Sequence, residues 1–252
     1  MNEVLVRKLE QFGTLSGQER TLVENASFAV RHVWDDQDLA RQGDPPSHCP
    51  LLLDGFACCY KTLESGQRQI VAFHIPTDLC DLTSVVLGQL DCSIGTLTPA
   101  RVALIPNATI LDWTRHHPGL GRLLWRASLV DAAVSREWVV NIGRRSAYQR
   151  TAHLLCEMAQ RLRSAGLANG HTYELPLTQV ELADALGLTP VHVNRTLQWL
   201  RGERLIEFGG GTLTVRNWRE LKLAAGFNPA YLHQLAAAKE NHSRMCHRRP
   251  TP

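Results

Sequence analysis

The order of apolar and polar residues divides the chain into a β-rich first half and a helical second half. Between residues 25 and 110, short apolar runs such as LLLDGFACCYKTL, RQIVAFHI and ARVALIP are separated by turn sequences. Strands that recur at this spacing are typical of a β-sandwich or barrel. The segment ESGQR between two runs predicts a hairpin in which Gly66 supplies the positive φ angle of a tight turn. Residues 1–20 are expected to form a short amphipathic helix and a lead-in.

From Pro118 onward, apolar residues recur at the spacing of one helix face. A long helix with a broad apolar stripe needs a partner, and a second copy of the same helix would give a two-fold dimer. We therefore predict a dimerisation surface formed by Leu123, Ala127, Val130, Val134 and Trp138. The alternative is that this stripe packs on its own domain. Gly143 interrupts the pattern and predicts a hinge at 143–145, after which Ser146 could cap a new helix that ends near Gly166.

Residues 177–206, LTQVELADALGLTPVHVNRTLQWLRGERLI, have the pattern of two short helices around a tight turn. Thr178 and Glu181 have the spacing of a capping box. Gly187 is expected to end the first helix, and Thr189 with Pro190 to begin the second. The inward-facing residues are expected to be Val180, Leu182, Ala183, Leu186, Val193, Leu197 and Leu200. The following segment, ERLIEFGGGTLTVRNW, predicts a β-hairpin, or wing, around three glycines.

The outward-facing residues of the second helix are small, polar or basic, and no acidic residue precedes Glu203. A helix-turn-helix places the amino end of this helix in the major groove of DNA. There Arg195 can pair with guanine, and Asn194 or Gln198 with adenine, while an apolar contact can read a thymine methyl. Side chains at the start of both helices can hold phosphates. The predicted DNA-binding residues are Thr178, Gln179, Thr189, Pro190, Val191, His192, Asn194, Arg195 and Gln198.

Composition limits the nucleic-acid surface to one part of the chain. The 252 residues suffice for two domains, 44% of them are hydrophobic, and the formal net charge is only +3. Between residues 144 and 204 there are eight arginines and five acidic residues, which can account for this excess. The amino terminus MNEVLVRKLEQFG is charged where a signal peptide is apolar, and no apolar run approaches a membrane span. We therefore expect a cytoplasmic protein without a membrane partner.

Cysteine and histidine positions indicate no cofactor. The seven cysteines are irregularly spaced and do not describe a disulfide framework, so we expect mostly buried thiols. Cys58 and Cys59 are adjacent and would point to opposite faces of a strand. His48 and His74 are candidate haem ligands, but a lone histidine on a β domain is more often structural. A metal role for His242, Cys246 and His247 is a weak alternative, and we predict no metal site. No motif of a common enzyme class is present, so we do not expect an enzyme.

The helix-turn-helix segment, followed by GGGTLTVRNWRELKLAAGF, resembles the winged helix-turn-helix of the Crp–Fnr superfamily of bacterial transcription regulators. The segment LARQGDPPSHCPLLLDGFACCYKTLESGQRQIVAFHIPTDLCDL is similar to that family's cyclic-nucleotide-binding-type β-roll, with its Gly-Asp turn at Gly43-Asp44 and its Pro-x-Asp turn at Pro76-Asp78. The resemblance covers nearly the whole chain and implies an α+β fold. The implied parts are a β-roll sensor domain over 1–117, a dimerisation helix over 118–143, a winged helix-turn-helix over 144–228, and a C-terminal helix with a flexible tail over 229–252.

The sequence departs from the family's cyclic-nucleotide binders in the sensor. In those proteins a Gly-Glu pair contacts the ribose and phosphate region, and an Arg-Ser or Arg-Thr pair neutralises the phosphate. Here the first pair is Cys80-Asp81, and GQLDCSIGTLTPARVALIP has no arginine before Arg101. Asp81 and Asp91 would place negative charge beside an anion. We therefore expect that cyclic AMP is not the effector, and we assign an unidentified effector to a pocket formed by Cys80, Asp81, Leu82 and Asp91.

Two further departures concern redox sensing and DNA recognition. The oxygen-sensing branch of the family uses an N-terminal cysteine cluster, whereas no cysteine precedes Cys49 here, so no iron–sulfur centre is expected. Cys80 beside Asp78 and Asp81 should have a raised thiol pKa, which argues against a redox switch. Val191 stands where activators of the family commonly carry a glutamate, while Arg195 matches their base-reading arginine. The half-site in DNA should therefore differ from the usual one.

Together, these observations predict a homodimeric, sequence-specific DNA-binding transcription regulator. The β-roll sensor would control the DNA-binding domain allosterically, and the regulator would bind a palindromic operator in double-stranded DNA. The resemblance further implies RNA polymerase as a partner. The alternative is a redox or small-ligand sensor that acts mainly through protein partners.

Overall fold

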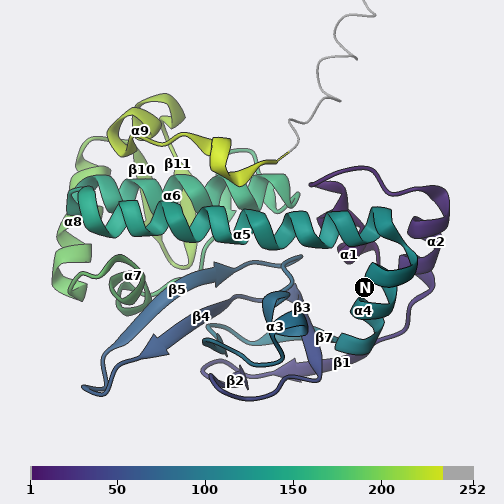
Figure 1. Cartoon of the computed structure of the whole chain (residues 1–252). Helices are drawn as coiled ribbons and strands as arrows, with labels where there is room; N and C mark the ends of the chain where they lie inside the picture. The colour runs from purple at the N-terminus through teal and green to yellow at the C-terminus, as the bar shows by residue number, and fades with distance from the viewer. Residues whose placement is uncertain (1, 235–252) are drawn as a thin grey trace, which may run out of the picture.

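A computed structural model describes residues 2–234 of the chain. It begins with two helices, α1 (Asn2–Glu10) and α2 (Gly17–Asn25), where the sequence predicted one. Ser16 begins α2 with a capping box, because its side chain accepts from the backbone of Glu19 and the Glu19 side chain accepts from the backbone of Ser16. Both helices lie near the amino end of a long helix, α5 (Pro118–Arg144), as Figure 1 shows.

The sensor half of the chain is a β-roll of two antiparallel sheets. One sheet has the strand order β1–β7–β3, and the other has the order β2–β6–β4–β5. The strands are β1 (Ala29–Val33), β2 (Asp38–Ala40), β3 (His48–Asp54), β4 (Ala57–Thr62), β5 (Arg68–His74), β6 (Ser93–Thr96) and β7 (Ala100–Pro106). A short helix, α3 (Thr83–Leu87), lies between β5 and β6 in the sequence, and α4 (Asn107–His116) leads from β7 to α5.

Local features of the β-roll follow the sequence pattern. The β4–β5 hairpin closes with a hydrogen bond from the Leu63 amide to the Gln67 carbonyl of 2.9 Å, and Gly66 has a φ angle of 82°. Cys58 belongs to the main hydrophobic core, whereas Cys59 belongs to a smaller core within the roll. The predicted hairpin and the opposite orientation of the two cysteines are thus confirmed.

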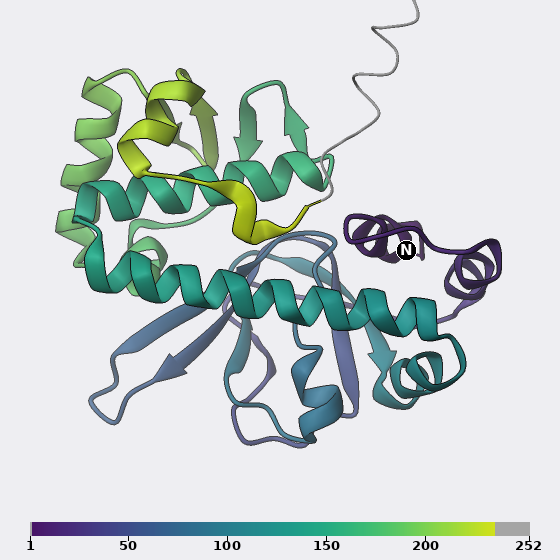
Figure 2. The same ribbon diagram turned by 45° about the horizontal axis from the view of Figure 1, so that its top comes forward.

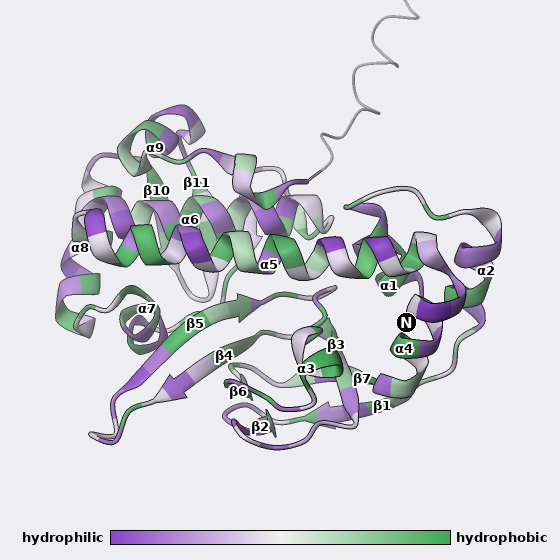
Figure 3. Ribbon diagram, viewed as in Figure 1, coloured by the Kyte–Doolittle hydropathy of each residue, from purple (hydrophilic) through white to green (hydrophobic). Residues whose placement is uncertain are grey.

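Helix α5 lies between the β-roll and the carboxy-terminal half of the chain (Figures 1 and 2). It ends at Arg144, and Arg145 is extended, so the break falls within the predicted segment 143–145, although Gly143 itself belongs to the helix. Figure 3 shows bands of hydrophobic residues along the whole length of α5. One set of these residues faces the protein's own core. A second set, which includes Trp125, Leu129, Val139 and Val140, is exposed.

The structure contradicts the predicted dimerisation surface. Its five residues are only 2–8% exposed, because the protomer itself covers them. They are Leu123, Ala127, Val130, Val134 and Trp138. Trp138 packs edge-on against Phe73 of β5 with 5.8 Å between ring centroids, and its indole N–H donates to the carboxylate of Glu157 at 3.2 Å. The stripe therefore packs on its own domain, which was the alternative prediction, because α5 is needed to cover both the β-roll and the next helix.

The carboxy-terminal half begins with that helix, α6 (Ala147–Ser164), which starts at a capping box formed by Ser146 and Gln149, as predicted. A four-stranded sheet has the order β10–β11–β9–β8. Its strands are β8 (Ala168–Asn169), β9 (Thr172–Glu174), β10 (Ile206–Gly209) and β11 (Thr212–Val215). The helices are α7 (Gln179–Leu186), α8 (Pro190–Gly202), α9 (Trp218–Ala225) and the 3-10 helix η1 (Pro229–Leu232).

The β10–β11 hairpin turns at Gly210 and Gly211, with φ angles of 59° and 73°, and forms the predicted wing. Of the segment 229–252, only residues 229–234 belong to the described part. His242, Cys246 and His247 lie outside it. Within residues 2–234, no helix combines the length and apolar character that a membrane span requires.

Candidate functional site

Three caps fix the geometry of α7 and α8. Thr178 Oγ1 accepts from the Glu181 amide at 3.2 Å, and Glu181 Oε2 accepts from the Thr178 amide at 2.6 Å. Gly187 ends α7 in the left-handed conformation with a φ angle of 60°. Thr189 Oγ1 then accepts from the His192 amide at 3.2 Å, with Pro190 as the first residue of α8. These caps are the ones predicted from the sequence, and together they set the turn between the two helices.

The inward faces of the two helices are also as predicted, with one exception. The buried residues include Leu182, Ala183, Leu186, Val193, Leu197 and Leu200. Val180, which was predicted to face inward, is 53% exposed, so this prediction is wrong. Val180 is two residues from Leu182 and therefore points about 200° away around the helix. The strong apolar character of its side chain misled the assignment.

The amino half of α8 presents a continuous outward surface. Val191 is 71% exposed, and Arg195 and Gln198 are exposed on the same helix, while His192 and Asn194 are half-buried. Asn194 Nδ2 donates to Gln179 Oε1 at 3.2 Å, which joins the start of α7 to α8. Thr178, Gln179, Thr189 and Pro190 are exposed at the amino ends of the two helices. The nine predicted DNA-binding residues thus lie at the start of α7 and along α8 from its N-cap to Gln198.

Trp199 is a surface residue that the sequence analysis missed. It lies one helical turn after Arg195 and is 50% exposed. Its spacing of four residues from Arg195 places it on the same side of α8, and this spacing was available in the sequence. The wing is held close to this helix, because the Arg201 guanidinium donates to the Phe208 carbonyl of β10.

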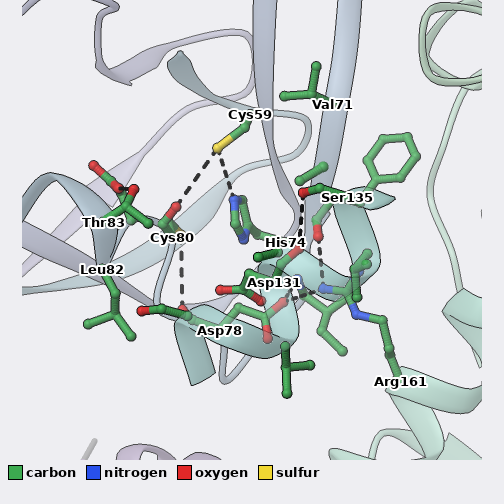
Figure 4. A pocket seen from close by; sticks show the side chains of 18 of the residues that line it. Cys59, Val71, His74, Asp78, Cys80, Leu82, Thr83, Asp131, Ser135 and Arg161 are labelled. Carbon is green, nitrogen blue, oxygen red and sulfur yellow. Dashed lines mark hydrogen bonds and ion pairs between the residues drawn. The ribbon is translucent and has the colours of Figure 1, made fainter. Parts of the chain in front are cut away.

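A cavity of about 480 Å³ lies between the β-roll and the two helices α5 and α6, where β5 and residues 75–83 face these helices. Cys80, Asp81, Leu82 and Asp91 all line it, so the four residues of the predicted effector pocket lie around one space. The lining also contains Asp131 and Ser135 of α5 and Arg161 of α6, which are labelled in Figure 4. These three residues were missed because they are far from the β-roll in sequence, and only the packing of α5 and α6 brings them there.

Asp78 is the centre of a buried ion cluster at the cavity wall. Its Oδ1 lies 2.7 Å from Lys8 Nζ of α1, and its Oδ2 lies 2.7 Å from Arg161 Nη2 of α6. Burial alone would raise the pKa of Asp78, but Lys8 and Arg161 lower it well below its usual value. Arg161 also donates to the carbonyl of Phe73 at 2.8 Å. The first helix after α5 is therefore bound directly to the sensor domain.

Thiols and an imidazole occupy another part of the cavity wall. Cys59 Sγ lies 3.2 Å from His74 Nε2, and both residues line the cavity (Figure 4). Burial lowers the pKa of His74 to about 4, so the imidazole is neutral at pH 7. Burial, together with the nearby Cys49 thiol, Asp78 and Asp81, raises the pKa of Cys80 well above its usual value, as predicted. The pKa of Cys59 is raised as well, by its hydrogen bond with Cys92 and by burial. Protonated thiols are poor redox switches, which weakens the redox alternative.

His48 is exposed and pairs with Ser47, at 2.7 Å between Nδ1 and the hydroxyl oxygen. Across residues 2–234, no group of three or more His, Cys, Asp or Glu side chains has an arrangement that could hold a metal ion.

A β-roll joined through a long helix to a winged helix-turn-helix defines the class of regulators that couple a sensor domain to a DNA-binding domain. The chain belongs to the Crp–Fnr family of this class. Residues 30–117 match the cyclic nucleotide-binding domain, and residues 149–224 match the Crp-like helix-turn-helix domain. It is accordingly a transcription regulator with a helix-turn-helix DNA-binding domain and a sensor domain of the cyclic-nucleotide-binding type.

Named relatives agree with this assignment. The chain is 28% identical to the transcriptional activator protein FnrL of Cereibacter sphaeroides over 177 residues, which are 69% of this chain and 71% of the relative. It is 24% identical to an anaerobic regulatory protein of Aggregatibacter actinomycetemcomitans over 215 residues, or 85% and 83% of the two chains. The solved structure of FixK2 from Bradyrhizobium japonicum matches 81% of this chain and all of its own with a TM-score of 0.72 at 23% identity, which shows a shared fold.

Proposed function

We propose that the protein binds a palindromic DNA operator as a homodimer, with the amino half of α8 in the major groove. The observation that carries this proposal is the exposed surface of Val191, Arg195 and Gln198 on a helix whose start is fixed by caps. Arg195 would donate two hydrogen bonds to a guanine, and Gln198 would pair with an adenine. Val191 would contact a thymine methyl.

The remaining residues of the site would set the position of α8 on the duplex. Thr178, Gln179, Thr189 and Pro190 surround the amino ends of α7 and α8, where free backbone N–H groups favour phosphates. His192 lies at the rim of the same surface. Because Gln179 accepts a hydrogen bond from Asn194, the two amides would approach DNA as a pair. One member could contact the backbone while the other reads a base edge.

A second copy of the chain would pair along the exposed face of α5. With the predicted stripe buried, the apolar residues that remain for a partner are Trp125, Leu129, Val139 and Val140. Exposed apolar residues that recur along one helix are typical of a protein interface. To read two successive major grooves, the two copies of α8 would have to lie about 34 Å apart, which corresponds to one turn of DNA.

Signals in the cavity would reach DNA through two contacts between the domains. Arg161 of α6 binds Asp78 in the cavity wall. At the start of β5, Arg68 Nε lies 2.8 Å from Asp184 Oδ2 of α7, and Gln69 donates to the Ala185 carbonyl at 3.3 Å. If an effector binds more tightly to one of two arrangements of these contacts, it would favour that arrangement. The position of α8 relative to the sensor domain would then change.

The proposal includes a location in the cytoplasm, where the DNA lies, and RNA polymerase as a partner at promoters. It assigns no resident cofactor. Cyclic AMP is not the proposed effector, because Asp81 and Asp91 both line the cavity and would repel a phosphate.

The direct test is to incubate the purified full-length protein with fragments of its own genomic DNA and to sequence the bound fraction. We expect enrichment of a palindrome whose half-sites contain a guanine under Arg195. Binding without any enriched sequence would contradict sequence-specific recognition. Failure to bind any fragment would contradict the DNA-binding function itself.

A further inference from the structure

The free charges around the sensor cavity are predominantly acidic. Asp81, Asp91 and Asp131 line the cavity, and none of them forms an ion pair within residues 2–234. Asp81 and Asp131 both raise the pKa of Cys80, in addition to the effect of burial, so they act on the same part of the wall. Asp81 Oδ1 accepts from the Thr83 hydroxyl at 2.8 Å, whereas its Oδ2 is buried without a hydrogen-bond partner.

The basic groups of the cavity are largely neutralised. Lys8 and Arg161 both bind Asp78, at 2.7 Å each, so neither is free to hold an anion. Lys61 is the remaining lysine in the lining, and it is exposed at the end of β4. The imidazole of His74 adds no positive charge, because burial keeps it neutral at pH 7. An anion in this space would therefore meet carboxylates without a free guanidinium or ammonium group beside them.

A polar group points to a ligand independently of the acidic residues. His74 lines the cavity and is 8% exposed, and its Nε2 is occupied by the Cys59 thiol. Figure 4 shows the imidazole ring between Cys59 and Asp131. Its other ring nitrogen forms no hydrogen bond with the described part of the chain, which leaves it for a group in the cavity. Val71, Phe73, Val130 and Val134 form apolar parts of the same wall.

We propose that this cavity binds a small organic cation, namely an ammonium or guanidinium group on an apolar body. The cationic group lies beside Asp131 and Asp81, and the apolar body packs on Phe73, Val130 and Val134. Charged hydrogen bonds to a carboxylate are stronger than neutral ones, and they would satisfy the unpaired Asp81 oxygen. This inference names the chemical class of the effector. The regulatory consequence of cation binding rests on the proposed function. The cavity volume of about 480 Å³ is in the range of small-molecule sites.

The test uses three ligands with one benzene ring and one two-carbon spacer: phenethylammonium, 2-phenylethanol and 3-phenylpropionate. Binding to the full-length protein is measured by isothermal titration calorimetry at pH 7. We expect phenethylammonium to bind about tenfold or more tightly than either of the other two, since one charge-assisted contact contributes about 1.4 kcal/mol or more. Asp131→Asn should remove this preference. The Asp131 carboxylate lines the cavity and has no hydrogen-bond partner within residues 2–234, and only the backbone carbonyl of this residue accepts, from the Ser135 hydroxyl at 3.0 Å, so the variant should fold.

The matched control is Asp35→Asn, which makes the same substitution on an exposed loop outside the cavity and should keep the preference. Tighter binding of 3-phenylpropionate would overturn the inference. So would an unchanged preference in Asp131→Asn, or the absence of phenethylammonium binding at millimolar concentration. The same samples are assayed for binding to genomic DNA. If the native protein binds DNA but not the cation, only the ligand inference fails. If the native protein does not bind DNA, the proposed function is contradicted.

Discussion

Asp78 and Arg161 join the sensor domain to the first helix of the DNA-binding half through a buried ion pair of 2.7 Å between Oδ2 and Nη2. Lys8 of α1 binds the other oxygen of the same carboxylate. Three segments that are far apart in sequence therefore meet at one side chain. The cluster also forms part of the cavity wall, so a ligand there lies directly beside the contact between the domains.

Replacing Asp78 should strongly destabilise the protein. Asp78→Asn removes the partner of Lys8 and leaves Arg161 paired only with Glu157, at 3.6 Å. Removing one partner of a buried ion pair typically costs about 3–5 kcal/mol. The measurement is urea unfolding at pH 7, with Asp35→Asn as the control. A loss below about 1 kcal/mol would show that the cluster is not a major source of stability.

The lowered pKa of Asp78 predicts how the free energy of unfolding changes in acid. The pKa of Asp78 is lowered in the folded protein, so its contribution to stability is present above the unfolded pKa of about 3.9. This contribution is lost as the pH falls below that value toward the folded pKa. Unfolding free energies measured between pH 5 and pH 3 should fall more steeply for the native protein than for Asp78→Asn. Parallel curves would contradict this assignment.

Arg195→Ala should reduce sequence discrimination more than general DNA affinity. A bidentate contact between arginine and guanine typically contributes about 1–3 kcal/mol of discrimination. Competition titrations between the enriched operator and random DNA should show this loss. Arg101→Ala, which changes an exposed arginine on β7, is the matched control and should bind as the native protein does. Equal losses on both DNAs would assign Arg195 to the phosphate backbone.

If the exposed face of α5 is the dimer interface, a charge introduced there should prevent dimerisation. Leu129 is 54% exposed, and Leu129→Glu would place a carboxylate between two apolar surfaces. Sedimentation velocity should show a monomer for this variant and a dimer for the native protein. Val86→Glu on α3, another strongly exposed apolar residue, should leave the dimer intact. A dimeric Leu129→Glu protein would exclude this face as the interface.

Asp131 predicts that cation binding depends on pH. The protein surrounding this carboxyl raises its pKa to about 6 by desolvation, and Asp78 also raises it, while Lys8 and Arg161 act in the opposite direction. A cation prefers the carboxylate, so the affinity for phenethylammonium should rise with pH between about 4 and 6 and level off above about 7. Asp131→Asn should flatten the profile. An affinity that falls with rising pH would contradict a role for this carboxylate.

Caps and spacing were sufficient to predict α7, α8 and the wing. Thr178, Gly187 and Thr189 act on residues within a few positions of themselves, so their effects can be derived from the order of residues. Val180 shows the limit of this approach, because the direction of an apolar residue near a helix start depends on where the helix begins. The hairpin at Gly66 and the opposite faces of Cys58 and Cys59 are local in the same sense.

The sequence alone determined the family, the helix-turn-helix and the residues that its second helix presents. Only the tertiary structure decided which face of α5 is covered by the protomer itself. The spacing of apolar residues along α5 is the same whether Trp138 contacts a second chain or, as observed, Phe73 and Glu157. The same is true of the cavity. Asp131 and Arg161 line it together with Asp78 and His74, although more than fifty residues of sequence separate the two pairs. The free energy of such long-range contacts depends on tertiary packing, which local sequence patterns do not reveal.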